Sequence, residues 1–159
     1  MTEPRSVMSR LAVTLGVSML IGCIPPSDQR PGLWLPGEKA AFPSDWSFSD
    51  AHREVALEVG TPYGLPHSVT IWCASLDGQL YVAARNPDQK RWPGWVEGRP
   101  DVRLGVDGRI FEGRLVRLDD PDWIARVWSR YAAKYDRPDP PPEGGPPMRY
   151  WHFAGRGPG

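Results

Sequence analysis

Short runs of alternating or β-branched residues, separated by turn residues, dominate the middle of the chain. The run 67–74 is rich in β-branched and aromatic side chains, and the run 80–85 has the same character. Between them lies Asp77-Gly78, a pair that favours the tight turn of a β-hairpin. These residues predict two antiparallel strands, and they form the clearest hairpin in the sequence.

Other runs extend this pattern into a sheet. A second Asp-Gly pair, Asp107-Gly108, joins the runs 102–106 and 109–118. Upstream, alternation over 54–59 favours a strand, although its alanine and glutamates would also suit a helix. The run 148–153 is typical of a last strand that closes the sheet. The sequence therefore predicts a mainly β domain of six antiparallel strands.

One helix is expected, after the fifth strand. Asp120 can cap its first turn, Pro121 suits the first helical position, and Asp122 favours the positive end of the helix dipole. Apolar residues then recur at helical spacing in one stripe, made of Ile124, Val127, Trp128, Tyr131 and Tyr135. We interpret the stripe as the face that packs on the sheet rather than as a binding surface.

Two polar or proline-rich stretches complete the domain. Residues 86–100 are expected to form a polar loop that contains basic and tryptophan residues. The segment 137–147 is so rich in proline that it can form neither helix nor strand. Both stretches should be irregular connections between the predicted elements.

The first 23 residues have the three parts of a secretory signal. Arg5 and Arg10 supply positive charge, an apolar run follows over 11–22, and the small residue Gly22 precedes Cys23. An apolar run of about 12 residues is well short of the roughly 20 that a membrane-spanning helix needs. The segment is therefore expected to be a signal peptide rather than a membrane span.

The tetrapeptide Leu20-Ile21-Gly22-Cys23 resembles the lipobox of bacterial lipoproteins. The resemblance implies cleavage before Cys23, lipid on its sulfur, and a lipid-anchored position in the bacterial cell envelope. In a Gram-negative host, Ile24 at the next position implies the outer membrane, with the protein facing the periplasm. The alternative is a cysteine that happens to close an ordinary signal peptide.

The chain is expected to have three parts. Residues 1–22 form the signal peptide, and residues 23–45 contain five prolines with little periodicity, which is typical of an extended tether. The apolar residues of the tether suggest that part of it packs back onto the domain. Residues 46–159 are long enough for one domain with its own hydrophobic core.

The balance of charge argues against one class of function, and the spacing of the histidines argues against another. Nineteen basic and nineteen acidic residues cancel, and no run of like charge stands out, so binding to nucleic acid or attraction to an anionic surface is not expected. The three histidines lack the spacing of a metal motif, and no metal site is predicted.

Cys73 is the only cysteine left once Cys23 carries lipid, so it can form no internal disulfide. Its apolar neighbours favour the role of a small buried hydrophobic residue. The alternative, a reactive thiol, finds no basic neighbour in the sequence to lower the pKa of the cysteine.

Three passages resemble a known superfamily. Residues 64–72 look like its second strand, 80–85 followed by the basic loop 90–95 look like its third strand and phosphate loop, and 101–114 look like its next hairpin. That superfamily is the flavin-binding split barrel, which includes pyridoxamine 5′-phosphate oxidase and the deazaflavin-dependent nitroreductases. The resemblance covers residues 54–153.

The resemblance implies a six-stranded antiparallel split barrel with a helix after the fifth strand, a homodimer, and FMN or a deazaflavin bound between subunits. The implied activity is that of an oxidoreductase acting on a small molecule. Basic residues would hold the cofactor phosphate, while tryptophans and hydroxyls would hold its ring. The implied cofactor-binding residues are His67, Ser68, Thr70, Arg85, Lys90, Arg91, Trp92 and Trp95.

The same residues allow a second interpretation. The basic residues would then belong to a solvated loop, and the tryptophans would anchor the core. The chain would be a cofactor-free binding or interaction module of the cell envelope.

Overall fold

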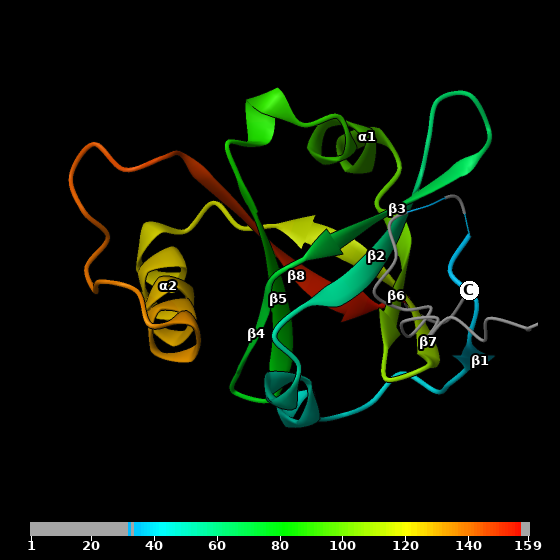
Figure 1. Ribbon diagram of the computed structural model, residues 1–159, viewed down its shortest axis with the longest axis horizontal. Coiled ribbons are helices and arrows are strands. Elements are labelled where there is room, and N and C mark those ends of the chain that lie inside the picture. The colour runs from blue at the N-terminus through cyan, green and yellow to red at the C-terminus, as the bar shows by residue number, and fades with distance from the viewer. Residues whose placement is uncertain (1–31, 33, 157–159) are drawn as a thin grey trace, which may run out of the picture.

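Eight strands form one sheet in the computed structural model, which describes Gly32 and residues 34–156 (Figure 1). In chain order the elements are β1 (Glu38–Lys39), the 3₁₀ helix η2 (Ser47–Ala51), β2 (Val55–Gly60), β3 (Pro66–Ile71), β4 (Cys73–Leu76), β5 (Gln79–Arg85), the 3₁₀ helix η3 (Pro87–Gln89), α1 (Trp92–Gly98), β6 (Asp101–Val106), β7 (Arg109–Arg117), α2 (Pro121–Tyr135) and β8 (Met148–Gly155). The expected lipidation site, Cys23, lies outside the described residues. Within the described part, no helix combines the length and apolar character needed to cross a membrane.

The strand order is β3-β2-β6-β7-β8-β5-β4, and every neighbouring pair along it is antiparallel. The short strand β1 adds to β7 in parallel. The prediction of a mainly β, antiparallel domain is therefore confirmed. Between the two end strands, β3 and β4, the described residues form no hydrogen-bonded ladder.

Three sequence-based expectations about the strands need correction. The run 67–74 forms two strands instead of one, because the chain breaks at Trp72 and its halves pair with different neighbours, β2 and β5. The tether supplies β1, so the sheet has eight strands and not six. The last strand, β8, lies inside the sheet between β7 and β5 rather than at its closure.

Both predicted Asp-Gly hairpins are confirmed. Asp77 and Gly78 have φ angles of 52° and 73°, and Asp107 and Gly108 have φ angles of 53° and 72°. Two successive residues in the left-handed region define the tight turn whose twist matches that of paired strands. The local sequence is therefore sufficient to join β4 to β5 and β6 to β7.

The predicted helix after the fifth expected strand is α2. The Asp120 carboxylate accepts hydrogen bonds from the backbone N–H groups of Asp122 and Trp123, at 2.9 and 3.4 Å. This cap satisfies donors that the first helical turn cannot pair internally. The helix begins at Pro121, as expected.

The prediction of a polar loop over 86–100 is wrong in part. The segment contains η3 and α1, and Trp92, Pro93 and Val96 of α1 are buried. Proline suits the first turn of a helix, and apolar residues four positions apart share one helical face. The tryptophan thus anchors a helix to the core.

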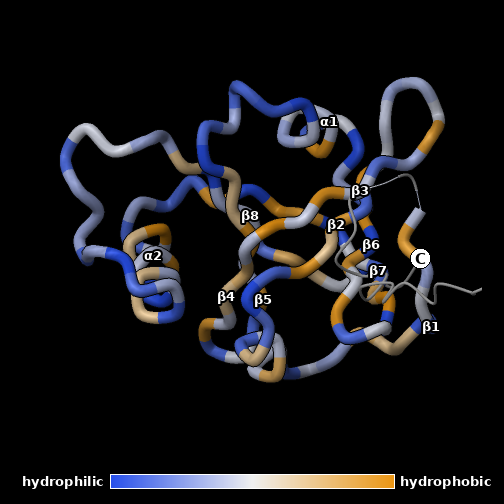
Figure 2. The backbone as a smooth tube through the Cα atoms, viewed as in Figure 1, coloured by the Kyte–Doolittle hydropathy of each residue, from blue (hydrophilic) through white to orange (hydrophobic). Residues whose placement is uncertain are grey.

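Buried side chains lie on both faces of the central strands. Hydrophobic positions recur along these strands (Figure 2). On β5, Leu80, Val82 and Ala84 join the larger core, which includes Trp46, Phe111 and Trp151. The alternate residues Tyr81 and Ala83 join a second core against α2. Because strand residues alternate between faces, the sheet separates two apolar layers.

The segment before η2 packs onto the domain, as the apolar residues of the tether suggested. Leu35 is buried against Ala56 and Ile110 on the outer face of β2. Its N–H donates to Glu58 at 2.6 Å, and Arg103 donates to both oxygens of that carboxylate. The cost of burying the Glu58 carboxylate is thus offset by hydrogen bonds from one backbone N–H and one arginine side chain.

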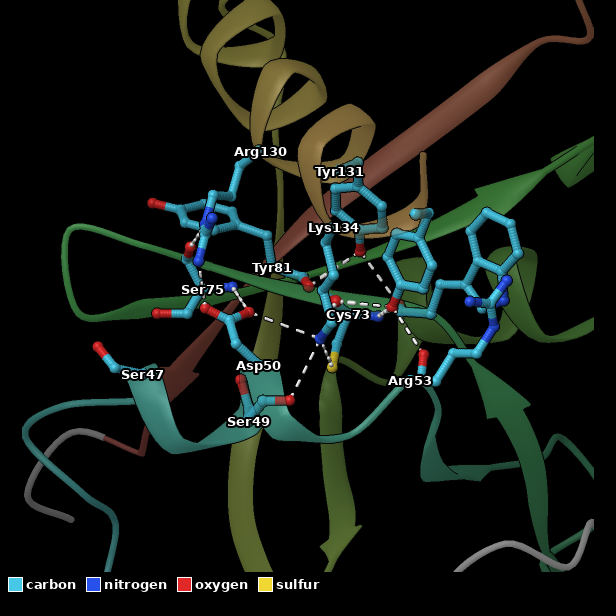
Figure 3. Close-up of polar contacts among 12 residues, drawn as sticks. Ser47, Ser49, Asp50, Arg53, Cys73, Ser75, Tyr81, Arg130, Tyr131 and Lys134 are labelled. Atoms are coloured by element: carbon cyan, nitrogen blue, oxygen red, sulfur yellow. Dashed lines mark hydrogen bonds and ion pairs between the residues drawn. The ribbon is translucent and has the colours of Figure 1, made fainter. Parts of the chain in front are cut away.

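The break at Trp72 is held by side chains from α2 (Figure 3). The Tyr135 hydroxyl accepts from the Cys73 N–H at 3.0 Å and lies 2.8 Å from the Cys73 carbonyl and 2.7 Å from the Arg53 carbonyl. The Tyr131 hydroxyl lies 3.1 Å from the Trp72 carbonyl. These contacts satisfy buried backbone groups that the interrupted strand leaves without a ladder partner.

Replacing Tyr135 by phenylalanine should test the importance of this bonding. Tyr135→Phe should lower the free energy of unfolding by about 2 kcal/mol, because buried backbone groups lose their partner. Tyr150→Phe is the matched control, since burial is the sole cause of its shifted pKa and its hydroxyl has no protein partner among the described residues. Urea denaturation followed by circular dichroism measures both; equal losses would contradict the prediction.

Candidate ligand-binding groove

A groove of about 1040 Å³ lies between α2, the proline-rich loop 137–147 and the sheet. Its volume is at the upper end of the range of small-molecule sites. Six aromatic side chains line it: Trp72, Trp92, Trp128, Tyr131, Tyr135 and Tyr150. In Figure 1 the loop and α2 lie together at one end of the molecule, beside β4 and β5.

The strand break places an aromatic pair in the wall of the groove. Trp72 stacks on Tyr135 with ring centroids 4.2 Å apart and an interplanar angle of 6°. The Arg137 guanidinium lies 5.2 Å from the centroid of the Trp72 ring. The Trp72 ring thus packs against both Tyr135 and Arg137, and the pair forms part of the aromatic wall of the groove.

Three cations and two carboxylates also line the groove: Arg85, Lys90, Arg137, Glu54 and Asp139. Arg85 ends β5, and Lys90 directly follows η3. Neither of these two side chains forms an ion pair with a residue that the structure describes, whereas the neighbouring Arg149 pairs with Asp88 and Glu97 at 3.2 Å. Arg85 and Lys90 are therefore available to an anionic group of a ligand.

The proline-rich loop is attached at both of its ends. The Trp128 indole donates to the Pro138 carbonyl at 3.2 Å, and the Asn86 N–H donates to the Pro147 carbonyl at 2.8 Å. Several prolines of the loop line the groove. The loop thus adds an apolar wall opposite the sheet.

Tyr150 offers the groove a hydrogen-bond donor. The residue is buried on β8 and lines the groove. Burial raises the pKa of its hydroxyl to about 12, so the group stays protonated near neutral pH. Its hydroxyl proton is available to a ligand oxygen or nitrogen.

The structure divides the eight predicted cofactor residues into two groups. Four of them line the groove: Thr70, Arg85, Lys90 and Trp92. The other four do not contribute to its lining: His67, Ser68, Arg91 and Trp95. The sequence predicted that the basic loop contacts a ligand. A local sequence pattern does not show which side chains of that loop face the groove.

The second group lies on β3 and in and just before α1, outside the lining of the groove. His67 packs edge-on against Trp95, with centroids 5.5 Å apart. Ser68 is buried, and its backbone pairs with Gly32. Arg91 is exposed immediately before α1.

The aromatic lining was not predicted as a site. The interpretation of the helix stripe as a packing face is confirmed for Val127, Tyr131 and Tyr135, which are buried against the sheet. Tyr131 and Tyr135 nevertheless also line the groove. The available signal was a tryptophan, Trp72, directly after the three β-branched residues Val69, Thr70 and Ile71.

A polar cluster lies below the break, between η2, β4 and α2 (Figure 3). The Lys134 ammonium is 3.6 Å from the Cys73 sulfur and 3.5 Å from an Asp50 oxygen. Burial nevertheless raises the pKa of the Cys73 thiol to about 11, outweighing the attraction of Lys134. A protonated, buried thiol fits the role of a small core residue better than that of a nucleophile.

Comparisons with known proteins bear on the fold. The sequence matches no family model, and it matches no curated protein. Among solved structures, it is similar to the conserved hypothetical protein Rv2991 from Mycobacterium tuberculosis, with a TM-score of 0.53 and 19% identity over 69% of this chain and 76% of that one.

A second similar structure is the protein Atu2129, of unknown function, from Agrobacterium tumefaciens str. C58. The TM-score is 0.50 at 19% identity, over 66% of this chain and 49% of that one, so the match spans about half of the Agrobacterium protein. At these identities the similarity supports the fold alone, a split-barrel-like antiparallel sheet.

The raised pKa of Cys73 should make the stability of the fold depend on alkaline pH. The thiol ionises at its ordinary pKa of 9.0 in the unfolded chain and near 11 in the folded one. The unfolded state therefore loses its proton first, and the free energy of unfolding should fall as the pH rises from 9 towards 11.

Cys73→Ala removes this contribution, which is about 3 kcal/mol at most. Tyrosine ionisation affects both proteins, so the measured quantity is the difference between their urea denaturation curves at several pH values. The wild-type protein should lose stability more steeply than the variant above pH 9. Parallel losses would show that the thiol does not contribute.

Proposed function

We propose that this chain is a lipid-anchored envelope protein whose groove binds a flat aromatic molecule bearing an anionic group, with FMN or a deazaflavin as the ligand. One observation carries the proposal: an aromatic groove whose rim presents two cations, Arg85 and Lys90, without ion-pair partners in the described chain. A flavin combines the two ligand properties that such a groove selects.

The walls suit the ring of this ligand. Trp72 and Tyr135 form an ordered aromatic stack in the wall of the groove. Trp92, a buried residue that follows Arg85 and Lys90 in the sequence, also lines the groove. An isoalloxazine would be bound by contact with these rings and by exclusion of water. Thr70 and Tyr150, which also line the groove, would supply hydrogen bonds to its polar edge.

The rim suits the phosphate. Arginine can bind phosphate through two parallel hydrogen bonds, and lysine adds a compact charge. Arg85 and Lys90 come from the end of β5 and from the turn after η3, so both are held by ordered backbone. They would fix the orientation of the ligand in the groove.

A bound flavin would supply hydride or electron transfer to a small-molecule substrate. The chain's own residues would bind the ring, hold the phosphate and keep water from the reacting face. The proline-rich loop, which lines the groove opposite the sheet, contributes to that exclusion. The implied activity is therefore that of an oxidoreductase.

In a second candidate function, the groove binds a ligand but no redox reaction takes place. It is favoured by the position of His67, Ser68, Arg91 and Trp95, which do not line the groove. The chain would then be an envelope module that binds a small aromatic acid. A colourless protein that binds such an acid would support this alternative.

The proposed location rests on the lipobox-like tetrapeptide that ends at Cys23. Lipid on this cysteine would hold the domain on the cell envelope, at the outer membrane facing the periplasm in a Gram-negative host. The signal lacks an adjacent arginine pair, which marks the export of folded cargo. A flavin would then be acquired after export, and the homodimer implied by the resemblance remains a prediction.

The two rim cations can be tested by comparing FMN with riboflavin, which lacks the phosphate. The double variant Arg85→Gln, Lys90→Gln should raise the Kd for FMN by tenfold or more, because each charge-assisted hydrogen bond is worth about 1.5–3 kcal/mol. The Kd for riboflavin should stay unchanged. Flavin fluorescence quenching measures both constants.

Arg91→Gln is the matched control, since Arg91 lies beside Lys90 in the chain but does not line the groove. Its Kd for FMN should equal that of the wild-type protein. Absence of binding of both FMN and a deazaflavin at micromolar concentration would overturn the flavin proposal. Equal loss of FMN and riboflavin binding would overturn the assignment of the phosphate to these cations.

A further inference from the structure

Three exposed apolar side chains lie near the end of the sheet that carries the turn between β2 and β3, and the ring of Tyr63 also packs edge-on against Trp95, with centroids 6.0 Å apart. Trp34 is 67% exposed, Tyr63 60% and Leu65 52%. Trp34 and Leu65 line one shallow pocket of about 350 Å³, and Tyr63 belongs to the turn between β2 and β3 that forms its edge. We call Trp34, Tyr63 and Leu65 the tip surface; Figure 1 shows the turn at the far end from α2.

The tip surface lies next to the point where the chain enters the domain. Gly32 is tied to β3 by two backbone hydrogen bonds with Ser68, at 2.7 and 3.2 Å. Cys23 precedes Gly32 by nine residues. Nine residues reach at most about 32 Å when fully extended, so lipid on Cys23 would hold this end of the domain within that distance of the bilayer.

We propose that the tip surface docks into the interfacial layer of the bilayer that holds the lipid anchor. This inference rests on the lipid anchor proposed above. Tryptophan and tyrosine concentrate at membrane interfaces because their rings are apolar and their polar atoms reach water. Leu65 adds a fully apolar group beside them.

Arg99 supports a lipid surface as the occupant. Its side chain is exposed, lines the same pocket as Trp34 and Leu65, and forms no ion pair with a described residue. A long arginine can lie along apolar surface and reach a lipid phosphate. The balanced charge of the chain leaves the apolar groups as the main attraction.

Docking would also orient the candidate groove. The turn between β2 and β3, which carries Tyr63 and Leu65, and the helix α2 lie at opposite ends of the longest axis of the molecule (Figure 1). The groove is formed by α2 and the loop 137–147. A docked domain would therefore hold the groove away from the bilayer, within reach of molecules in solution.

The test uses the acylated mature protein in vesicles of phosphatidylethanolamine and phosphatidylglycerol. A nitroxide label is attached at Leu65→Cys, and the matched control carries it at Ala133→Cys, an exposed site on α2. Cys73 is buried and is not labelled in the folded protein. Accessibility is measured to oxygen, which concentrates in lipid, and to a water-soluble nickel chelate.

The label at residue 65 should become accessible to oxygen and shielded from nickel, while the label at 133 should show the reverse. Adding Trp34→Ala and Tyr63→Ala to the Leu65→Cys protein should lower the ratio of docked to undocked domain by about tenfold or more. Both replaced side chains are largely exposed, and Tyr63 loses only an edge contact with Trp95, so the thermal unfolding temperature should change little. Vesicle flotation should also persist, because the acyl anchor is intact.

Each contrary result has a distinct meaning. A label at residue 65 that stays open to nickel on floating vesicles would overturn docking while leaving the lipid anchor in place. Protein that neither floats nor carries acyl mass would overturn the anchor, and with it the docking that rests on it. Shielding of residue 65 from both reagents without vesicles would show that a second copy of the chain covers the tip surface, which also overturns the proposal.

Discussion

Hydrogen bonds from α2 hold the backbone at the point where β3 gives way to β4. Tyr131, Lys134 and Tyr135 lie on consecutive turns of one helical face, and their polar ends reach the carbonyls of Trp72 and Cys73 and the Cys73 N–H. A strand that breaks inside a folded domain leaves such groups without ladder partners, and a buried unpaired group costs about 1–3 kcal/mol. The helix removes that cost, so the break and the position of α2 depend on each other.

The geometry of the sheet and of the groove follows from this arrangement. The break lets one stretch of chain pair with β2 through its first half and with β5 through its second, so β3 and β4 form the two ends of a single sheet. It also brings Trp72 onto the ring of Tyr135, where both line the groove. The same helix that stabilises the strand break therefore builds the aromatic wall of the candidate binding site.

The two proposed activities occupy different ends of the molecule. The groove lies beside α2, and the tip surface lies at the turn between β2 and β3, next to the entry of the tether (Figure 1). In the proposed arrangement the membrane contact and the ligand site are therefore separate, and they share no lining residue among those that the structure describes. The net charge of the chain is zero, so the molecule as a whole does not attract charged ligands or lipids. Each proposed site therefore depends on its own local side chains.

The sequence by itself determined the features that depend on neighbouring residues. Asp77-Gly78 and Asp107-Gly108 set their turns through backbone conformation, and Asp120 with Pro121 set the start of α2 through capping. Only the tertiary structure decided that Trp92 would anchor a helix, that Glu58 would be buried beside Arg103, and which of the predicted cofactor residues would face the groove. Those outcomes join residues far apart in the chain, and their energies come from burial and long-range hydrogen bonds that no local pattern records.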